Sequence, residues 1–340
     1  MKNKQIIFTA PRKAELLETE ISPVADDEVL VEVAFSTISN GTERANVSGD
    51  PTVSYTDYSG VAKFPRTLGY STAGTVIEVG KNVTSVAVGD RVAISWAHHA
   101  KYNKVKECNV HKIESDKISL SEAAIVHIAC FPMAALRKCH LEIGEPAIVM
   151  GLGLLGLMGV QLLRAAGAVP VIAVDPIPEK RAEALKLGAD YALDPFDPDF
   201  AKTVKALTHG GAKVGLEVTG VGAGLNGILD CMAPMGRVAL LGCTRNSDFS
   251  IDYYRKVHGP GISLIGAHTV ARPKVESSEG LWTTHDDMMA ILRLIAAGRV
   301  NLVQMVAETH RPEECQEIYD RLMDDKLFPL VQYDWREVNA

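Results

Sequence analysis

The chain has 340 residues, of which 47% are hydrophobic and 23% are charged, and its formal net charge is −7. This balance is ordinary for a globular protein, and without a basic cluster it argues against a nucleic-acid or membrane surface. The length favours two domains. We expect no signal peptide or membrane span, and six dispersed cysteines without a C-x-x-C pair fit reduced thiols in the cytoplasm.

The first 118 residues predict short β-strands. The segment EVLVEVAFSTIS alternates apolar and polar residues, and AGTVIEVG and GDRVAISW are bounded by glycine turns. Strands at this spacing favour a small barrel or a folded sheet. The alanine-rich segment that follows predicts a helix, with Ser121 as its expected N-cap.

From Ala147 onward, predicted strands and helices alternate. AIVMG, VIAVD, YALDP, GLEVTG and RVALLG read as strands, and LLGLMGVQLLRAAG and PEKRAEALKLG as helices. Such βαβ alternation predicts a doubly wound parallel sheet. Two further helices are expected after about residue 270. The predicted domains are therefore residues 1–120 with 270–340, which are β-rich, and residues 121–269, which form the α/β sheet.

A G-x-G-x-x-G motif follows the first strand of this sheet. Gly151 permits a tight turn, Gly153 lets the backbone approach a pyrophosphate, and Gly156 allows close packing of helix on strand. Asp175 ends the next strand, about 20 residues further on, where a carboxylate bonds ribose hydroxyls and repels a 2′-phosphate. Because Pro176 rather than arginine follows it, the predicted cofactor is NAD.

These motifs, together with NGTER, LGYSTAGTVIEVG and VGDRV, resemble the medium-chain dehydrogenase/reductase superfamily, the zinc alcohol and polyol dehydrogenases. The resemblance covers essentially the whole chain and implies a GroES-like first domain, a Rossmann second domain and oxidation of a small hydroxylated substrate. It also implies that Thr219 and Gly220 meet the ribose on the nicotinamide side. The predicted cofactor-binding residues are Gly151, Gly153, Leu154, Leu155, Gly156, Asp175, Arg181, Thr219 and Gly220.

The sequence departs from this family where the family binds its catalytic zinc. Asn40 stands in place of the zinc cysteine, Tyr70 and Ser71 replace the His-Glu pair, and His127 falls at the later ligand position. Three of these four groups are neutral and not normally deprotonated, so they form a poor zinc set and we expect no metal. The four-cysteine lobe that holds structural zinc in the family is also missing.

Without zinc, a side chain has to take the proton of the substrate hydroxyl. His127 is the first candidate base and Tyr70 the second, because the pKa of imidazole lies near neutrality. The resemblance assigns Thr42 to the substrate hydroxyl and Trp96 to the substrate pocket, although barrel packing would also explain Trp96. The predicted catalytic residues are Asn40, Thr42, Glu43, Tyr70 and His127, with Ser71 and Trp96 in the substrate pocket. One of His98 and His99 could face inward, but a solvated loop is the favoured interpretation.

Three functions remain open at this stage. The favoured one is an NAD-dependent dehydrogenase of a sugar, polyol or glycoside hydroxyl, and "SxxSxGTE" with "GYxxxG" resembles the branch of glycoside 3-dehydrogenases and bacteriochlorophyllide dehydrogenases. A zinc-free quinone or enone reductase is the second, which Asp175 disfavours because those enzymes usually use NADPH. A non-catalytic NAD-binding protein is the third. The segment GISLIGAHTV resembles the family's dimerising edge strand, so a homodimer or homotetramer is expected.

Overall fold

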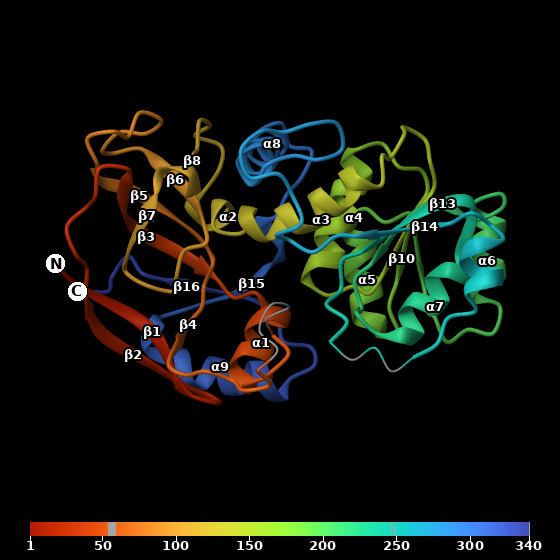
Figure 1. Cartoon of the computed structure of the whole chain (residues 1–340), viewed down its shortest axis with the longest axis horizontal. Helices are drawn as coiled ribbons and strands as arrows, with labels where there is room; N and C mark the ends of the chain where they lie inside the picture. The colour runs from red at the N-terminus through yellow and green to blue at the C-terminus, as the bar shows by residue number, and fades with distance from the viewer. Residues whose placement is uncertain (54–58, 246, 248, 340) are drawn as a thin grey trace. The chain divides into compact units, whose positions relative to one another are not determined.

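A computed structural model of the chain describes residues 1–53, 59–245, 247 and 249–339, and it separates into two compact units (Figure 1). The first unit comprises Met1–Ile128 and Met288–Ala340, and the second comprises Ala129–Asp287. One unit is rich in antiparallel strands and the other is built on a parallel sheet. The predicted α/β class is therefore confirmed.

The second unit extends to Asp287, further along the chain than the predicted boundary near residue 270. The reason is a buried ion-pair cluster that ties the segment after strand β14 (Ser263–Gly266) to helix α3 (Val126–Lys138). Arg137 Nε lies 2.7 Å from Asp287 Oδ1, and Arg272 Nη1 lies 3.1 Å from Asp287 Oδ2. Arg272 also donates to the carbonyl oxygen of Cys130. A buried carboxylate needs such partners, so this segment stays with the second unit.

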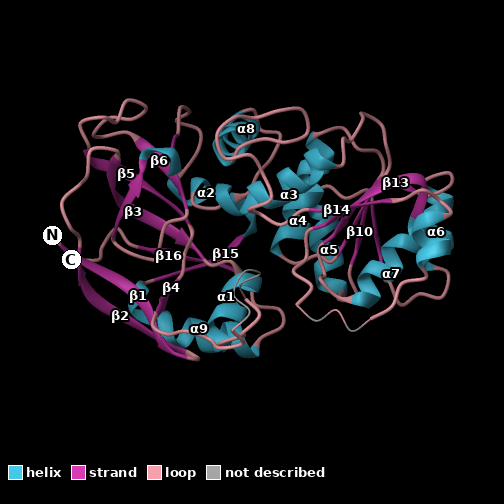
Figure 2. Ribbon diagram, viewed as in Figure 1, coloured by secondary structure: helices cyan, strands magenta, loops and turns pink. Residues whose placement is uncertain are grey.

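The first unit contains two sheets, drawn in magenta in Figure 2. The larger one runs in the order β15-β16-β3-β5-β6-β8, with β7 paired to β3, and the smaller one in the order β2-β1-β4. The strands are β1 Lys2–Ala10, β2 Lys13–Glu20, β3 Glu28–Thr37, β4 Arg66–Thr67, β5 Ser71–Val79, β6 Arg91–Ser95, β7 Tyr102–Lys106, β8 Val110–Lys112, β15 Val306–His310 and β16 Leu330–Asp334. The helices of this unit are α1 Asn40–Ser48, α2 Leu120–Ala123 and α9 Cys315–Asp324.

Strand register brings distant parts of the first unit together. β3 and β5 are antiparallel with Ser36 opposite Thr72, so residues just after β3 lie beside residues just before β5. β5 and β6 are antiparallel with Ser71 opposite Ser95. Trp96, which follows β6, therefore reaches the same edge of the sheet as Tyr70.

The sheet of the second unit has the order β11-β10-β9-β12-β13-β14, and all of its strand pairs are parallel. The strands β9 and β10 are buried at every residue, as expected for parallel strands covered on both faces. Helix α4 contacts β9, β10 and α5, whereas α6 contacts α7. The elements are β9 Ala147–Met150, α4 Leu154–Ala165, β10 Val171–Val174, α5 Pro178–Lys186, β11 Tyr191–Leu193, α6 Phe200–Leu207, β12 Ala212–Glu217, α7 Gly222–Cys231, β13 Met232–Leu240 and β14 Ser263–Gly266.

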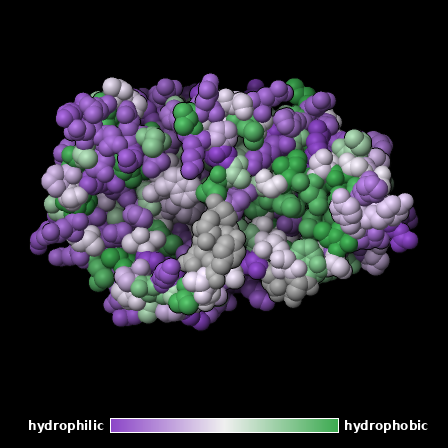
Figure 3. Space-filling view, viewed as in Figure 1, coloured by the Kyte–Doolittle hydropathy of each residue, from purple (hydrophilic) through white to green (hydrophobic). Residues whose placement is uncertain are grey.

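Two longer helices, α3 Val126–Lys138 and α8 Thr284–Ala296, begin in one unit and end in the other. The predicted N-cap at Ser121 is wrong, because Ser119 caps α2 by accepting a hydrogen bond from the backbone N–H of Glu122. Within the described parts of the chain, no helix combines the length and apolar character needed to cross a membrane. On the face shown in Figure 3, hydrophilic residues dominate the part formed by the first unit, and apolar residues are more frequent over the second.

Candidate functional site

The glycine-rich turn joins β9 to α4 in the second unit. Gly151 has a φ of +99°, which favours glycine, and Gly153 precedes the first residue of α4. A Cβ on Gly156 would lie 1.9 Å from the carbonyl oxygen of Gly151, so this residue has to be glycine for the helix to pack on the turn. A Cβ on Gly153 would meet nothing within 4 Å, so that glycine leaves an open approach to the backbone.

The start of α4 offers unpaired donors beside that approach. Leu154 and Leu155 form its first turn, where backbone N–H groups have no acceptor within the helix. Such groups, with the positive end of the helix dipole, favour a phosphate. This geometry suits the pyrophosphate-binding role predicted for the turn.

Asp175 closes the turn from the end of β10. Its Oδ2 accepts a hydrogen bond from the N–H of Leu152 and its Oδ1 from the N–H of Ile177, each at 2.9 Å. Each oxygen keeps a second lone pair, so the carboxylate can still accept ribose hydroxyls. Arg181 Nη1 donates to the carbonyl oxygen of Asp175 at 2.7 Å and lies 3.3 Å from Asp194 Oδ2, which holds its guanidinium beside this edge.

Thr219 and Gly220 follow β12, next to the glycine-rich turn. A Cβ on Gly151 would lie 2.8 Å from Cγ2 of Thr219, so the two turns touch. Glu217, which the sequence analysis missed, accepts hydrogen bonds from the Thr219 hydroxyl and from the N–H groups of both residues. Burial raises the pKa of Glu217, and these donors oppose that shift. An acidic residue at the end of a mostly apolar strand was the available signal.

Tyr70, Trp96 and His127 form an aromatic cluster in the first unit. The ring of His127 lies edge-on to both others, with centroid distances of 5.4 Å to Tyr70 and 4.8 Å to Trp96. His127 Nδ1 donates to the carbonyl oxygen of Tyr70 at 2.8 Å. His127 is 1% exposed and Trp96 is 42% exposed, with an unusual positive φ of 59° at Trp96. The structure therefore brings together three of the predicted site residues.

Asn40 and Thr42 lie in the first turn of α1. Asn40 Nδ2 donates to the carbonyl oxygens of Phe328 and Pro329, at 2.9 and 3.2 Å. Its Oδ1 is buried and has no hydrogen-bond partner among the described residues. The side chain of Thr42 is half-buried. A buried acceptor without a partner carries a desolvation cost, and a bound donor would remove it.

Glu43 does not lie with this cluster but in the core. The side chain is fully buried, with Oε2 accepting the hydroxyl of Tyr319 at 2.6 Å and Oε1 accepting the N–H of Ser39 at 3.0 Å. His99 Nε2 lies 3.2 Å from each oxygen. The favoured interpretation of His98 and His99 as a solvated loop is therefore wrong for His99, which is fully buried, whereas His98 is exposed.

Ser71 is also turned into the fold. It is buried, and its Oγ donates to the carbonyl oxygen of Ala124 at 2.7 Å. Its predicted place in the substrate pocket stays a prediction. Among the residues whose placement is described, no group of three or more histidine, cysteine, aspartate or glutamate side chains is arranged to hold a metal ion.

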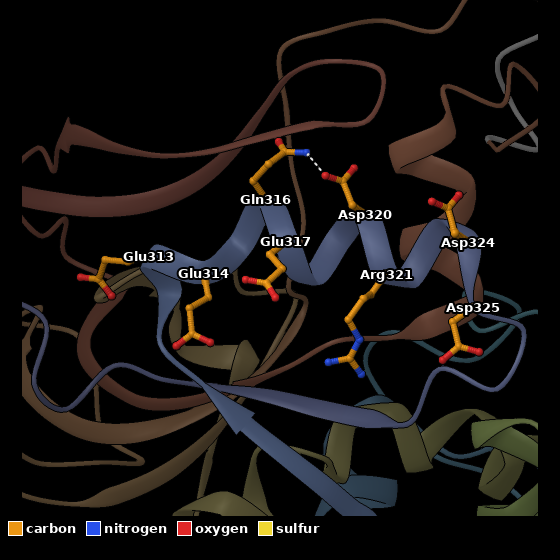
Figure 4. A pocket seen from close by; sticks show the side chains of 8 residues that line it. All are labelled: Glu313, Glu314, Gln316, Glu317, Asp320, Arg321, Asp324 and Asp325. Carbon is orange, nitrogen blue, oxygen red and sulfur yellow. Dashed lines mark hydrogen bonds between the residues drawn. The ribbon is translucent and has the colours of Figure 1, made fainter.

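A different feature of the first unit is an open groove along α9, with a volume of about 940 Å³ (Figure 4). Its lining residues are Glu313, Glu314, Gln316, Glu317, Asp320, Arg321, Asp324 and Asp325. Six carboxylates against one guanidinium make it unfavourable for a cofactor that carries a pyrophosphate. None of the predicted site residues lines it.

Comparisons with known proteins agree with this architecture. The family model described as "Alcohol dehydrogenase GroES-like domain" matches residues 25–132, and the one described as "Zinc-binding dehydrogenase" matches residues 155–281. The chain is 29% identical over 288 residues to the D-guloside 3-dehydrogenase of Shigella flexneri, covering 79% of this chain and 82% of that protein. It is 26% identical over 353 residues to the L-threonine 3-dehydrogenase of Pyrococcus abyssi, covering 94% of each.

The fold is also shared with a solved structure, that of 2R,3R-butanediol dehydrogenase from Bacillus subtilis. The TM-score is 0.82 at 21% identity, with 98% of this chain and 99% of that chain covered. The chain belongs to the medium-chain dehydrogenase/reductase superfamily, as the resemblance predicted. It is a dehydrogenase of the alcohol dehydrogenase type, with a GroES-like and a Rossmann domain.

Proposed function

We propose that the protein is an NAD-dependent dehydrogenase that oxidises a secondary hydroxyl of a sugar, polyol or glycoside without a catalytic zinc ion. The observation that carries this proposal is the hydrogen bond from His127 Nδ1 to the carbonyl oxygen of Tyr70. A carbonyl only accepts, so this bond fixes the imidazole tautomer and leaves Nε2 as the basic nitrogen of the neutral ring. A side-chain base is what a dehydrogenase without zinc requires.

The zinc set of the family does not fit the residues present here. Ser71 uses its hydroxyl hydrogen on Ala124, and Asn40 uses its amide nitrogen on two backbone carbonyls. Of the four replacements only His127 is an ordinary zinc ligand, because neutral amide and hydroxyl oxygens are not among the usual ligands of zinc. This set of residues would not hold a zinc ion.

NAD fits the second unit. The glycine-rich turn and the start of α4 would hold the pyrophosphate, and Asp175 would accept the ribose hydroxyls. The charge of Asp175 disfavours the 2′-phosphate of NADP. When bound, the nicotinamide ring supplies the hydride acceptor for oxidation of the substrate carbon.

The proposed roles of this chain's own residues follow from their chemistry. Nε2 of His127 would take the proton from the oxygen of the substrate hydroxyl, and the carbon that carries this oxygen would lose its hydride to the cofactor's acceptor ring, which gives a carbonyl product. Tyr70, Thr42 and the partnerless Oδ1 of Asn40 bind hydroxyl groups, which suits a substrate with several of them. The half-exposed indole of Trp96 covers an apolar part of the substrate.

Two relatives support the substrate class and the reaction. One is named as a dehydrogenase of a guloside and the other as a dehydrogenase of L-threonine, and both names describe oxidation of a hydroxyl at position 3. Tyr70, Thr42 and Asn40 would together offer several polar groups, which favours the glycoside over the smaller amino acid. Nothing in the described part of the first unit favours an enone over an alcohol as the substrate.

We further propose a homodimer that pairs through β14. This strand is at the edge of its sheet, with only β13 beside it among the described strands, and Leu264 and Ile265 are half-buried on it. An edge strand with free backbone groups and apolar side chains favours pairing with a second copy. The N–H of Ala267 bonds to β13, so the alternate residue Leu264 directs its N–H to the open edge. Replacing Leu264 with proline removes that outward donor, and light scattering would then report a monomer. We also propose a cytoplasmic location, since no disulfide joins any of the six cysteines.

The test of the function is NADH formation at 340 nm with NAD⁺ and a panel of glycosides, sugars and polyols, each with and without a strong chelator. Turnover that survives the chelator supports both parts of the proposal. Turnover that appears only after zinc is added contradicts the zinc-free site but keeps the dehydrogenase. Tight NADH binding without turnover on any substrate supports the non-catalytic alternative.

A further inference from the structure

We propose that Ser39 is a positioning residue for the hydroxyl of Tyr70, an inference that rests on the proposed function. Tyr70 Oη donates its hydrogen to Ser39 Oγ across 2.5 Å. Ser39 is buried, whereas Tyr70 is half-buried. This bond ties the Tyr70 hydroxyl to a buried side chain, so it fixes the direction in which the phenol presents its oxygen.

Ser39 makes this contact at the expense of its usual role at a helix start. It occupies the N-cap position of α1 with an extended backbone, at φ −93° and ψ 90°. A serine at this position normally accepts a hydrogen bond from the first turn of the helix. Here its side chain caps no N–H group. The hydroxyl bonds to Tyr70 instead. Because Ser39 does not use its side chain to cap α1, we infer that its role is to hold Tyr70.

Glu43 holds Ser39 from the opposite side. Its Oε1 accepts the backbone N–H of Ser39 at 3.0 Å, and its other oxygen accepts the hydroxyl of Tyr319 at 2.6 Å. His99 lies between Glu43 and Ser36, with Nδ1 at 2.7 Å from Ser36 Oγ. Every one of these side chains is buried. The carboxylate predicted to be catalytic therefore acts, in this proposal, as the anchor of the residue that orients Tyr70.

The same network reaches His127. The carbonyl oxygen of Tyr70 accepts the Nδ1 hydrogen of His127, and the two rings meet edge-on. Ser39 thus holds the side chain of the residue whose backbone orients the proposed base. A shift of Tyr70 would disturb both groups, so loss of the Ser39 hydroxyl should lower turnover more than cofactor binding.

The experiment is a double-mutant cycle with S39A, Y70F and the double variant, assayed with NAD⁺ and the best glycoside of the panel. We expect S39A to lower kcat roughly tenfold with the KM for NAD⁺ unchanged, and to have no further effect in the Y70F background. S39T keeps a hydroxyl and should recover most of the activity. S48A is the matched control, because Ser48 is exposed at the other end of α1 and bonds only within it. An equal loss from S39A in both backgrounds overturns the role of Ser39.

A second readout needs no substrate. The same four proteins are unfolded in urea, and the Ser39–Tyr70 hydrogen bond should appear as a coupling of roughly fivefold in the unfolding equilibrium constant. Zero coupling overturns the inference whether or not a substrate is known. Absence of wild-type turnover on every substrate, with the coupling present, contradicts the proposed function and leaves the contact itself in place.

Discussion

The backbone carbonyl of Tyr70 accepts a hydrogen bond from Nδ1 of His127 over 2.8 Å. One residue precedes β5 and the other lies in the first turn of α3, so the contact joins two elements that are distant in the sequence. It decides which imidazole nitrogen is basic. It also fixes the ring against the aromatic side chain of the same tyrosine.

The first prediction concerns His127 as the base. Replacing His127 with alanine should lower kcat by about 10²–10⁴, because the substrate proton then has no positioned acceptor. NADH affinity, measured by fluorescence titration, should stay unchanged. H98A is the matched control, because His98 is exposed and belongs to the same unit. A variant H127A with wild-type kcat would remove this residue from the mechanism.

The second prediction concerns metal. Prolonged dialysis against a strong chelator should leave kcat unchanged, because Asn40, Tyr70 and Ser71 provide none of the thiolate, imidazole or carboxylate groups that zinc prefers. Metal analysis of the active protein should find less than one zinc ion per chain. Loss of activity that zinc alone restores would contradict this expectation.

The third prediction separates two glycines of the same turn. Gly156→Ala should destabilise the protein by about 3 kcal/mol or more, because its Cβ would overlap the carbonyl oxygen of Gly151. Gly153→Ala should fold normally, since its Cβ would meet nothing within 4 Å, but should bind NADH roughly tenfold more weakly. Thermal unfolding and NADH titration measure the two effects. Equal stability of both variants would contradict the assigned roles.

The fourth prediction concerns cofactor choice. Asp175→Asn keeps an acceptor for the N–H groups of Leu152 or Ile177 but removes the negative charge that would disfavour a 2′-phosphate. The ratio of kcat/KM for NAD over NADP should fall by about tenfold or more. Asp194→Asn, which alters a different carboxylate beside Arg181, should leave the ratio close to that of the wild type. An unchanged ratio in D175N would contradict the role of Asp175.

The fifth prediction concerns pH and Glu308. Two hydrogen bonds from Arg321 and one from His310 lower the pKa of Glu308 to about 2. The pKa of this carboxyl is lower in the folded state than in the unfolded state. The charged carboxylate therefore stabilises the folded protein at pH values above the unfolded-state pKa, and this contribution is lost as the pH falls toward about 2. Glu308→Gln should therefore cost on the order of 1 kcal/mol or less at pH 6, because solvent screens this exposed pair.

The comparison for Glu308 is made by urea unfolding at pH 6 and pH 3. The difference between E308Q and the wild type should shrink at the lower pH, since the wild-type carboxylate begins to take up a proton in the unfolded state. Glu313→Gln serves as the control, because it changes a neighbouring carboxylate that is not paired with Arg321 or His310 in the described part of the chain. A difference that is constant with pH would show that the charge of Glu308 is not the source of the effect.

Much of this protein was predictable from local patterns in its sequence. The alternation of apolar strands with helices predicted the parallel sheet, and the glycine spacing with Asp175 predicted the turn beside α4. These features depend on residues close together in the chain, where backbone geometry and periodicity act directly. Single short segments also carried the resemblance to the family. The same segments showed that its zinc ligands are replaced at Asn40, Tyr70 and Ser71.

Only the tertiary structure decided which polar residues face one another. Glu43 was expected beside the substrate, but it lies in the core with Tyr319 and His99, because α9 and the segment after β6 supply donors that no local pattern reveals. Ser39 is unremarkable as a sequence position until the register of β3 and β5 brings it to Tyr70. Strand register and helix packing are long-range properties, set by the burial of whole faces. They determined the partners of each site residue, whereas the sequence determined the kinds of chemistry that were available.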